Sequence, residues 1–369
     1  ALKALRVPLV AMIRGYCVGG GMAMAMRADL RIASSDSRFG IPAAKLGVSY
    51  VDQDTYPVSG DFVPVPAEDG GARENAYHTD WKYSGKVAYT PNATDEYAIG
   101  FVHQEGEKGT PPYTGTVASY LKYWRWPKWD KQTVYYVSNT KLGESSYIKP
   151  RFFYDWYDNG LDQYKDATYT TLLTGSWAPS QYSDHSYGGT IEAGTELIPQ
   201  NTLKAALHYK LDHHDEQIID QPHFIFEDRT ISAGLEDTWH LGESWDFQVG
   251  AAYDWRKTLR ADQVNPDNTP VARTTFDSVN PEAGLFYKLG KLGTLHGTVA
   301  RKSRFPTIKD RYSYKFNTAF PNADLKPENV MHYELGYDGE LLPGLTLHPS
   351  VYYSRIHDAI QSVSRVNGT

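Results

Sequence analysis

The stretch LKAALHYKLD, Leu203 to Asp212, determines the fold expected of this 369-residue chain. Its odd-numbered positions are all apolar or aromatic, whereas most of the positions between them carry Lys, His or Asp. Successive side chains of a β-strand point to opposite faces, so a period of two predicts a strand with one apolar face and one polar face.

The same alternation recurs around Ile231 to Leu241 and around Val249 to Arg256. From about Tyr50 onward the chain is rich in Tyr, Trp, Thr and Gly, and no segment of convincing helical period follows. We therefore expect the larger part of the chain to consist of half-exposed strands of about ten residues each.

The connections between these strands alternate in length. Short turns are expected at 91–95, 139–143, 198–201, 241–244, 289–293 and 342–344, and long polar loops lie between them. This spacing predicts about six hairpins, or about twelve strands, with short turns at one end and long loops at the other. Such asymmetry is typical of an antiparallel transmembrane β-barrel and is not required of a soluble β-sandwich.

Aromatic residues near the expected strand ends suit the two membrane interfaces, although ordinary cross-strand packing is the alternative. The residues concerned are Tyr89, Tyr135, Tyr136, Trp156, Trp239, Trp255 and Tyr353.

Composition excludes several classes of protein. The net charge of -7 and the lack of a basic stripe argue against nucleic acid as a partner. The single cysteine, Cys17, excludes an intrachain disulfide and a cysteine-cluster metal site. No apolar run is long enough for a membrane-spanning helix, and the first residues lack the features of a secretory signal peptide.

Residues 1–48 differ from the rest because they are rich in Ala, Met and Leu and contain no Trp. A strand at Val7 to Ile13, a glycine turn and a helix at Met22 to Ala28 are expected there. We thus predict two parts, a short α/β piece at 1–48 and a β-barrel part at 49–369.

The larger part resembles the TonB-dependent outer-membrane receptors of the siderophore and iron-complex type. Three stretches carry this resemblance: KVAYTPNATDEYAIGFVHQEGEKGTPPY (86–113), YWRWPKWDKQTVYYVSNTKLGESSYIKPRFFYDWYDN (123–159) and RKSRFPTIKDRYSYKFNTAFPNADLKPENVMHYELGY (301–337). The resemblance implies a barrel of about 22 strands, of which this chain holds about twelve. It also implies uptake of a scarce ligand through a plug domain that the TonB complex moves.

The partners that the resemblance implies are outer-membrane lipid, the TonB complex and an iron complex such as a ferric siderophore. No resident cofactor is expected. The chain shows no plug domain, no TonB-contact segment and no final strand ending on an aromatic residue. We therefore expect a barrel fragment.

Two groups of residues are candidates for ligand contacts in the long loops. Aromatic rings could stack on an aromatic or amphiphilic ligand, with loop packing or an interfacial girdle as the alternative; they are Tyr113, Tyr123, Trp124, Trp126 and Trp129. A weaker candidate is a hard-metal cluster, for which a solvated charge run is the alternative; it comprises His213, His214, Asp215 and Glu216.

The N-terminal stretch VPLVAMIRGYCVGGGMAMAMRADLRIASSDSRFGIPAAKLG (7–47) is similar to the crotonase superfamily, which includes enoyl-CoA hydratases and isomerases. The resemblance implies that the Gly20 N–H is one half of an oxyanion hole. The positions that match the hydratase carboxylates are Ala23 and Ala43, and alanine cannot transfer a proton. We therefore expect no catalysis, although an acyl-CoA enzyme is the second interpretation and a soluble all-β binding module the third.

An enzyme-like stretch joined to a barrel indicates a chimera, formed by gene fusion or by an assembly artefact.

Overall fold

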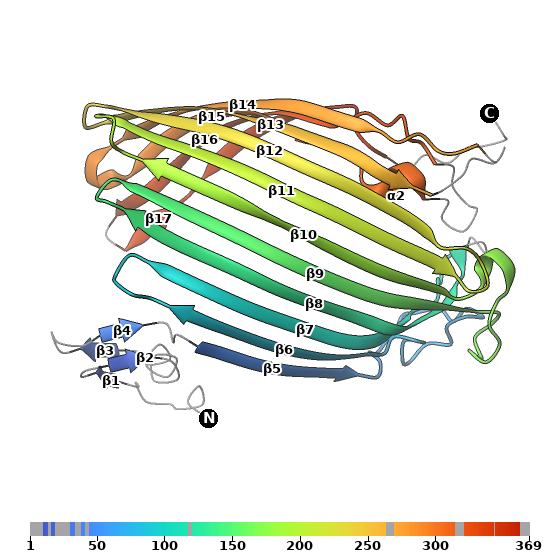
Figure 1. The fold of residues 1–369 in the computed structure, drawn as a ribbon. Coiled ribbons are helices and arrows are strands. Elements are labelled where there is room, and N and C mark those ends of the chain that lie inside the picture. The colour runs from blue at the N-terminus through green and yellow to red at the C-terminus, as the bar shows by residue number, and fades with distance from the viewer. Residues whose placement is uncertain are drawn as a thin grey trace.

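A computed structural model describes residues 10–13, 16–18, 30–33, 38–40, 44–116, 120–262, 269–313, 321–342 and 344–361. Most of these residues belong to one large antiparallel sheet that curves into a barrel wall (Figure 1). The helix predicted at Met22 to Ala28 lies outside the described residues, as do Gly20, Ala23 and Ala43.

Twelve long strands follow one another around the wall, and each pairs with its neighbours in sequence. They are β5 (Ala44–Gln53), β6 (His78–Tyr89), β7 (Glu96–Thr110), β8 (Tyr123–Leu142), β9 (Ser146–Tyr164), β10 (Ser180–Thr195), β11 (Asn201–Ile218), β12 (Phe224–Leu241), β13 (Trp245–Ala261), β14 (Thr275–Lys288), β15 (Thr294–Arg304) and β16 (Glu328–Leu342). The prediction of a mainly β, antiparallel barrel fragment is confirmed.

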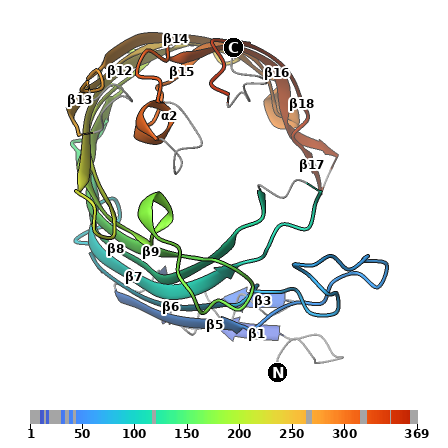
Figure 2. The ribbon, with the colours of Figure 1, turned by 90° about the vertical axis from the view of Figure 1, so that its right-hand side faces the viewer.

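The last two strands of this sheet are short. Both β17 (Leu345–Leu347) and β18 (Ser350–His357) pair with β16, so together they form one interrupted strand. Seen along its axis, the wall surrounds a lumen and holds helix α2 (Ile308–Tyr312) inside it (Figure 2). Among the described strands, β5 has a partner on one side only, and so does the β17–β18 strand.

The N-terminal part contributes four further short strands. Strand β1 (Val10–Ile13) pairs in parallel with β3 (Leu30–Ala33), and β2 (Tyr16–Val18) pairs in parallel with β4 (Arg38–Gly40). The strand expected at Val7 to Ile13 is therefore present over the residues that are described.

The strands are longer than predicted, since they range from 10 residues in β5 to 20 in β8. The estimate of ten residues reflected what is needed to cross a hydrocarbon layer. The hydrogen-bonded ladder between β8 and β9 continues well beyond that length.

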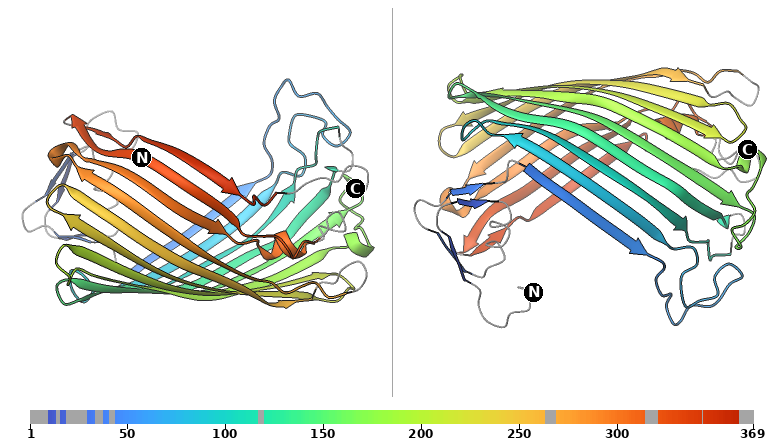
Figure 3. Two further views of the ribbon diagram at one scale, coloured as in Figure 1. Left: turned by 90° about the horizontal axis from the view of Figure 1, so that it is seen from above. Right: turned by 60° about the horizontal axis from the view of Figure 1, so that its bottom comes forward.

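Short turns and long loops alternate as predicted except between β11 and β12, where the connection at residues 219–223 is as short as the turns. Short turns join β6 to β7, β8 to β9, β10 to β11, β12 to β13 and β14 to β15 at one end of the barrel. The longer connections, such as 54–77 and 305–327, lie at the opposite end (Figures 1 and 3). The turns at Gly143 and Gly242 have φ values of 67° and 68°, which glycine adopts without a Cβ clash.

The two faces of the wall differ in chemistry. Cross-strand partners share a face, and one row of partners runs through Ile99, Tyr136, Phe152, Gly189 and Tyr209. This row is outward, and its aliphatic and aromatic side chains are widely exposed; Ile99, for example, is 57% exposed. Polar and charged residues occupy the alternate, lumen-facing positions, as the period of two predicted.

Outward orientation is confirmed for most of the aromatic residues assigned to strand ends. It is wrong for Tyr135, because the outward position belongs to its neighbour Tyr136. Tyr135 pairs with Gly100 and Phe153 on the lumen face, and its ring covers the place where a Cβ of Gly100 would lie. Two adjacent tyrosines in a strand cannot share a face.

The predicted boundary at residue 48 falls within a single strand. Strand β5 begins at Ala44 and pairs continuously with β6 as far as Gln53. Residues 44–48 therefore belong to the barrel wall.

No helix within the described ranges is both long enough and apolar enough to cross a bilayer.

Replacing Gly143 by Ala tests the turn geometry. Because φ is 67° at this position, we expect the substitution to lower the free energy of unfolding by about 1 kcal/mol. Gly60→Ala is the matched control, since a Cβ at Gly60 meets nothing within 4 Å. Denaturant unfolding of the two variants provides the measurement, and equal stabilities would contradict the assigned turn.

Candidate ligand-binding site at the loop end of the barrel

Aromatic side chains and one lysine gather on the lumen face where β7, β8 and β9 approach the long loops. The ammonium of Lys108 lies 3.3 Å from the ring centroid of Trp129 and 5.8 Å from that of Trp126. Trp126 and Trp129 meet edge to face at 5.2 Å, and Trp129 contacts Tyr157 in the same way at 5.3 Å. We call Lys108, Trp126, Trp129 and Tyr157 the lumen aromatic cluster.

A β-bulge in β8 creates this cluster. Trp126 and Trp129 are three residues apart, so a regular strand would place them on opposite faces. The register of β8 against both neighbours shifts between Arg125 and Lys131, and one extra residue is accommodated there. Trp126 consequently pairs with Lys108, Trp129 pairs with Asn159, and both indoles face the lumen.

A second ring cluster surrounds Arg125. Its guanidinium lies 4.2 Å from the ring centroid of Tyr169 and within 6 Å of those of Tyr77 and Tyr164. Arg125 Nε also donates to Asn75 Oδ1. Burial raises the pKa of the Tyr169 phenol to about 12, despite the opposing charge of Arg125, so the ring is neutral at physiological pH.

Asn75 connects these elements. Its amide donates to the carbonyls of Thr110 and Trp124 at 2.8 Å each, so it joins the end of β7 to the start of β8. Asn75 has a φ of 51°, which asparagine tolerates better than most residues.

The five aromatic residues predicted to contact ligand therefore divide into groups. Trp126 and Trp129 belong to the lumen aromatic cluster, and Trp124 pairs with Gln163 nearby. Tyr123 meets Tyr169 edge to face at 5.9 Å. Tyr113 lies in the loop between β7 and β8, where it contacts Tyr120. Four of the five are in strand β8, although loops were expected.

The four residues proposed as a hard-metal cluster are also in a strand and not in a loop. They are consecutive in β11, so their side chains alternate between the two faces. His213 Nδ1 lies 2.9 Å from Glu227, whereas His214 Nδ1 lies 2.6 Å from Asp184. Asp215 pairs with His223, and Glu216 lies 3.5 Å from the other nitrogen of His214. The structure does not bring the four together.

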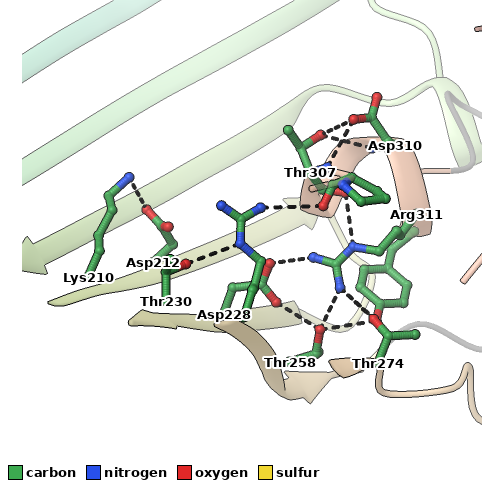
Figure 4. A network of polar contacts seen from close by, with 12 residues as sticks. Lys210, Asp212, Asp228, Thr230, Thr258, Thr274, Thr307, Asp310 and Arg311 are labelled. Carbon is green, nitrogen blue, oxygen red and sulfur yellow. Dashed lines mark hydrogen bonds and ion pairs between the residues drawn. The ribbon is translucent and has the colours of Figure 1, made fainter. Parts of the chain in front are cut away.

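A buried charge pair holds helix α2 against the lumen wall (Figure 4). The guanidinium of Arg311 is fully buried; it contacts Asp228 Oδ2 and donates to Thr258 Oγ1 and Thr274 Oγ1. Asp228 accepts a further bond from Thr258 at 2.8 Å. Asp228 belongs to β12 and Thr258 to β13, so these bonds hold α2 against the wall inside the barrel.

The start of α2 is closed by a capping box. Thr307 Oγ1 accepts from the Asp310 N–H, and the Asp310 carboxylate accepts from the Thr307 N–H and hydroxyl. Burial alone would raise the pKa of Asp310, but these bonds and the charges of Arg304 and Arg311 outweigh it and lower the pKa. Asp310 is therefore ionised at neutral pH.

Several members of these clusters could not be found from the sequence. Lys108, Tyr157 and Tyr169 reach the tryptophans or Arg125 only through strand register and loop folding. Arg311 and Asp228 are 83 residues apart, and neither position carries a local pattern that indicates a partner.

Comparison with known proteins agrees with this architecture. A family model described as TonB dependent receptor-like, beta-barrel matches residues 49–369. The chain belongs to this family. A second model, enoyl-CoA hydratase/isomerase, matches residues 1–53 and overlaps the first within β5.

The solved structures most similar to the chain include outer-membrane receptors of one architecture. The FrpB iron transporter from Neisseria meningitidis gives a TM-score of 0.66 at 13% identity, over 86% of this chain and 50% of that one. The copper transporter OprC gives a TM-score of 0.65 at 14% identity, over 85% of this chain and 49% of that one. The ferric yersiniabactin uptake receptor FyuA from Yersinia pestis gives a TM-score of 0.54 at 16% identity, over 86% of this chain and 50% of that one. The chain spans about half the length of these receptors.

Curated relatives match the N-terminal region. The fatty acid oxidation complex subunit alpha of Pseudomonas putida is 38% identical over 102 residues, which are 28% of this chain and 12% of that protein. A probable enoyl-CoA hydratase of Mycobacterium leprae is 49% identical over 47 residues, 13% of this chain and 18% of that protein. The chain thus spans a small part of each enzyme.

Replacing Arg311 by Met tests the anchoring of α2. The change leaves Asp228 as a buried charge without its partner, so we expect a loss of about 3–5 kcal/mol in the free energy of unfolding. We also expect faster proteolysis within 305–327. Arg304→Met is the control, because the ion pair of Arg304 with Asp310 is half exposed. A variant as stable as this control would contradict the anchoring role.

Proposed function

We propose that the chain forms part of the wall of an outer-membrane, TonB-dependent transporter that takes up an iron complex such as a ferric siderophore. The partners proposed with it are outer-membrane lipid and the TonB complex. The iron complex is cargo, and no resident cofactor is proposed.

The observation that carries this proposal is the position of the lumen aromatic cluster. It lies inside the barrel at the loop end, on the path of a solute entering from the side of the long loops. Indole faces and a phenol ring can stack on flat ligand groups. Lys108 supplies a cation for the carboxylate, catecholate or hydroxamate groups that surround ferric iron.

The names of the similar structures support iron transport as the class of function, since FrpB is named an iron transporter and FyuA a ferric yersiniabactin receptor. OprC is named a copper transporter, so the family resemblance alone does not select the ligand.

Truncating Trp129 tests the ligand site. For the refolded chain in detergent micelles, we expect saturable quenching of tryptophan fluorescence by a panel of ferric siderophores. Trp129→Ala should weaken binding of the tightest-binding siderophore by about 1 kcal/mol, roughly fivefold in Kd. Trp156→Ala is the matched control, because Trp156 lies on the outward face of the adjacent strand. Preferential binding of cobalamin would contradict the iron assignment, and equal effects of the two substitutions would contradict the site.

The membrane-facing role of the outer surface can be tested at Leu207. Leu207 is 54% exposed on the outward face, and its neighbour His208 faces the lumen, where it bonds with Thr190. Leu207→Arg should cost about 2–4 kcal/mol of unfolding free energy in lipid vesicles. His208→Arg should cost much less, because a charge there remains in water. Equal costs in guanidinium titrations would contradict a lipid-facing wall.

Enoyl-CoA hydratase or isomerase activity is the second candidate, because residues 1–53 match that family. We propose that the chain is not an enzyme, since Ala23 and Ala43 stand where the family pattern has carboxylates. Hydration of crotonyl-CoA by the purified chain would overturn this.

A further inference from the structure

The connection between β5 and β6, residues 54–77, folds into a compact loop with its own hydrogen bonds. Val65 and Glu68 exchange two backbone hydrogen bonds of 2.9 Å. The N–H of Val58 donates to the carbonyl of Gly71, and the N–H of Arg73 donates to the carbonyl of Tyr56. Gly70 and Gly71 have φ values of 90° and 82°, which permit the chain to reverse there. The reversal brings the carboxylates that precede and follow it close together.

Three carboxylates converge at this reversal. One oxygen from each of Glu68, Asp69 and Glu74 lies within 4.8 Å of the others. Asp69 and Glu74 are exposed, whereas the Glu68 side chain is completely buried. Exposed carboxylates alone do not make a binding site. Glu68 differs from the other two because its carboxylate is buried.

The two oxygens of Glu68 have different environments. Oε2 accepts from Arg73 Nη1 at 2.5 Å and from the Glu74 N–H at 3.0 Å. Oε1 is buried and has no hydrogen-bond partner. A buried carboxylate oxygen without a partner is costly unless a cation or another donor occupies the adjacent space.

Space for such a partner is present. A cavity of about 240 Å³ is lined by Glu68, Asp69 and Glu74 together with Pro112, Ala167 and Tyr169. The Tyr169 hydroxyl at this cavity is a second buried polar atom without a hydrogen-bond partner. Glu68 and Tyr169, which carry the two unsatisfied oxygens, thus line the cavity together with the two exposed carboxylates.

The charge of the cavity suits a divalent cation. Burial alone would raise the pKa of Glu68, but the Glu74 N–H, the Arg73 guanidinium and the Gly70 N–H outweigh it and lower the pKa. With Glu68 ionised, three carboxylates and one guanidinium leave two negative charges. Ca²⁺ prefers oxygen ligands in flexible arrangements and completes its shell with water.

We propose that Glu68, Asp69 and Glu74 form a binding site for a hard divalent cation of the Ca²⁺ type, which joins three of the long loops. Glu68 Oε1 is the buried ligand, and Asp69 and Glu74 supply the exposed ones. Pro112 belongs to the loop between β7 and β8, and Arg73 Nη2 already donates to its carbonyl at 2.6 Å. Tyr169 belongs to the loop between β9 and β10, and its ring also packs against Arg125.

Occupation of this site would therefore fix the loop residues that surround Arg125. The inference does not depend on the proposed transport function, because cation binding can be measured without any transported ligand.

Terbium luminescence tests the site directly, since Tb³⁺ replaces Ca²⁺ at oxygen sites and is excited by a nearby phenol ring such as that of Tyr169. For the full chain folded in detergent, we expect saturable Tb³⁺ luminescence that CaCl2 displaces. Asp69→Asn should weaken Tb³⁺ binding about tenfold or more, because it removes one ligand charge. Asp61→Asn, an exposed acid of the same loop, should leave the affinity unchanged.

Heat-modifiable gel migration establishes that each variant is folded before titration. Glu74→Gln provides a second exposed substitution, so the test does not rely on the buried Glu68. Luminescence that does not saturate would overturn the proposal. The same conclusion would follow if Asp69→Asn and Glu74→Gln both bound Tb³⁺ as tightly as the unmodified chain.

Discussion

Backbone hydrogen bonding between neighbouring strands is the constraint on which the rest of the structure depends. Each long strand is held by its neighbours over most of its length, so the face of every side chain is determined by its cross-strand partners. A slip of one residue would exchange the apolar exterior and the polar lumen. Departures from regular pairing are found where the loop end begins, in β8 between Arg125 and Lys128 and opposite Glu227 and Asp228 in β13. The bulge in β8 places Trp126 and Trp129 together on the lumen face, which a regular strand would not do.

The pairing of β12 with β13 determines where a charge pair is buried in the lumen. Thr258 lies opposite Asp228 in the regular register that extends from the turn between β12 and β13, and both face inward; the extra residue of β13, Leu259, comes after this pair. Arg311 then reaches this pair from α2, while Tyr312 stacks on Phe226 at 5.5 Å and covers the site. A buried ion pair contributes little net stability compared with apolar packing. Its effect here is to hold α2 at one position on the lumen wall, where the Arg311 guanidinium meets the buried Asp228 carboxylate.

The sequence predicted the fold well because the evidence for it is local. The period of two and the alternation of turn and loop lengths are visible within windows of ten to sixty residues, and both are present in the structure. The candidate site was harder to predict from the sequence. Trp126 and Trp129 could be named as candidates, but only the bulge in β8 shows that they share a face. His213 to Glu216 looked like a loop because four polar residues adjoin. In β11 successive side chains point to opposite faces, and the partners of His213 and His214 are Glu227 of β12 and Asp184 of β10. Lys108, Tyr157 and Arg311 reach their partners through strand register and loop folding, which no local pattern in the sequence reveals.

The junction between the two families in the chain also follows from strand geometry. Both family matches include residues 49–53, and β5 extends across them from Ala44. The sequence AKLGVSY alternates apolar and small or polar residues, so Leu46, Val48 and Tyr50 lie on the outward face opposite Gly85, Tyr83 and Trp81. Among the described strands β5 has a neighbour on one side only. Its sequence therefore has to fit the hydrogen-bonded ladder with β6 and the alternation of outward and lumen-facing side chains. Residues 44–53, which lie partly within the region that matches an enzyme family, therefore satisfy both the alternation of faces in the barrel wall and the ladder with β6.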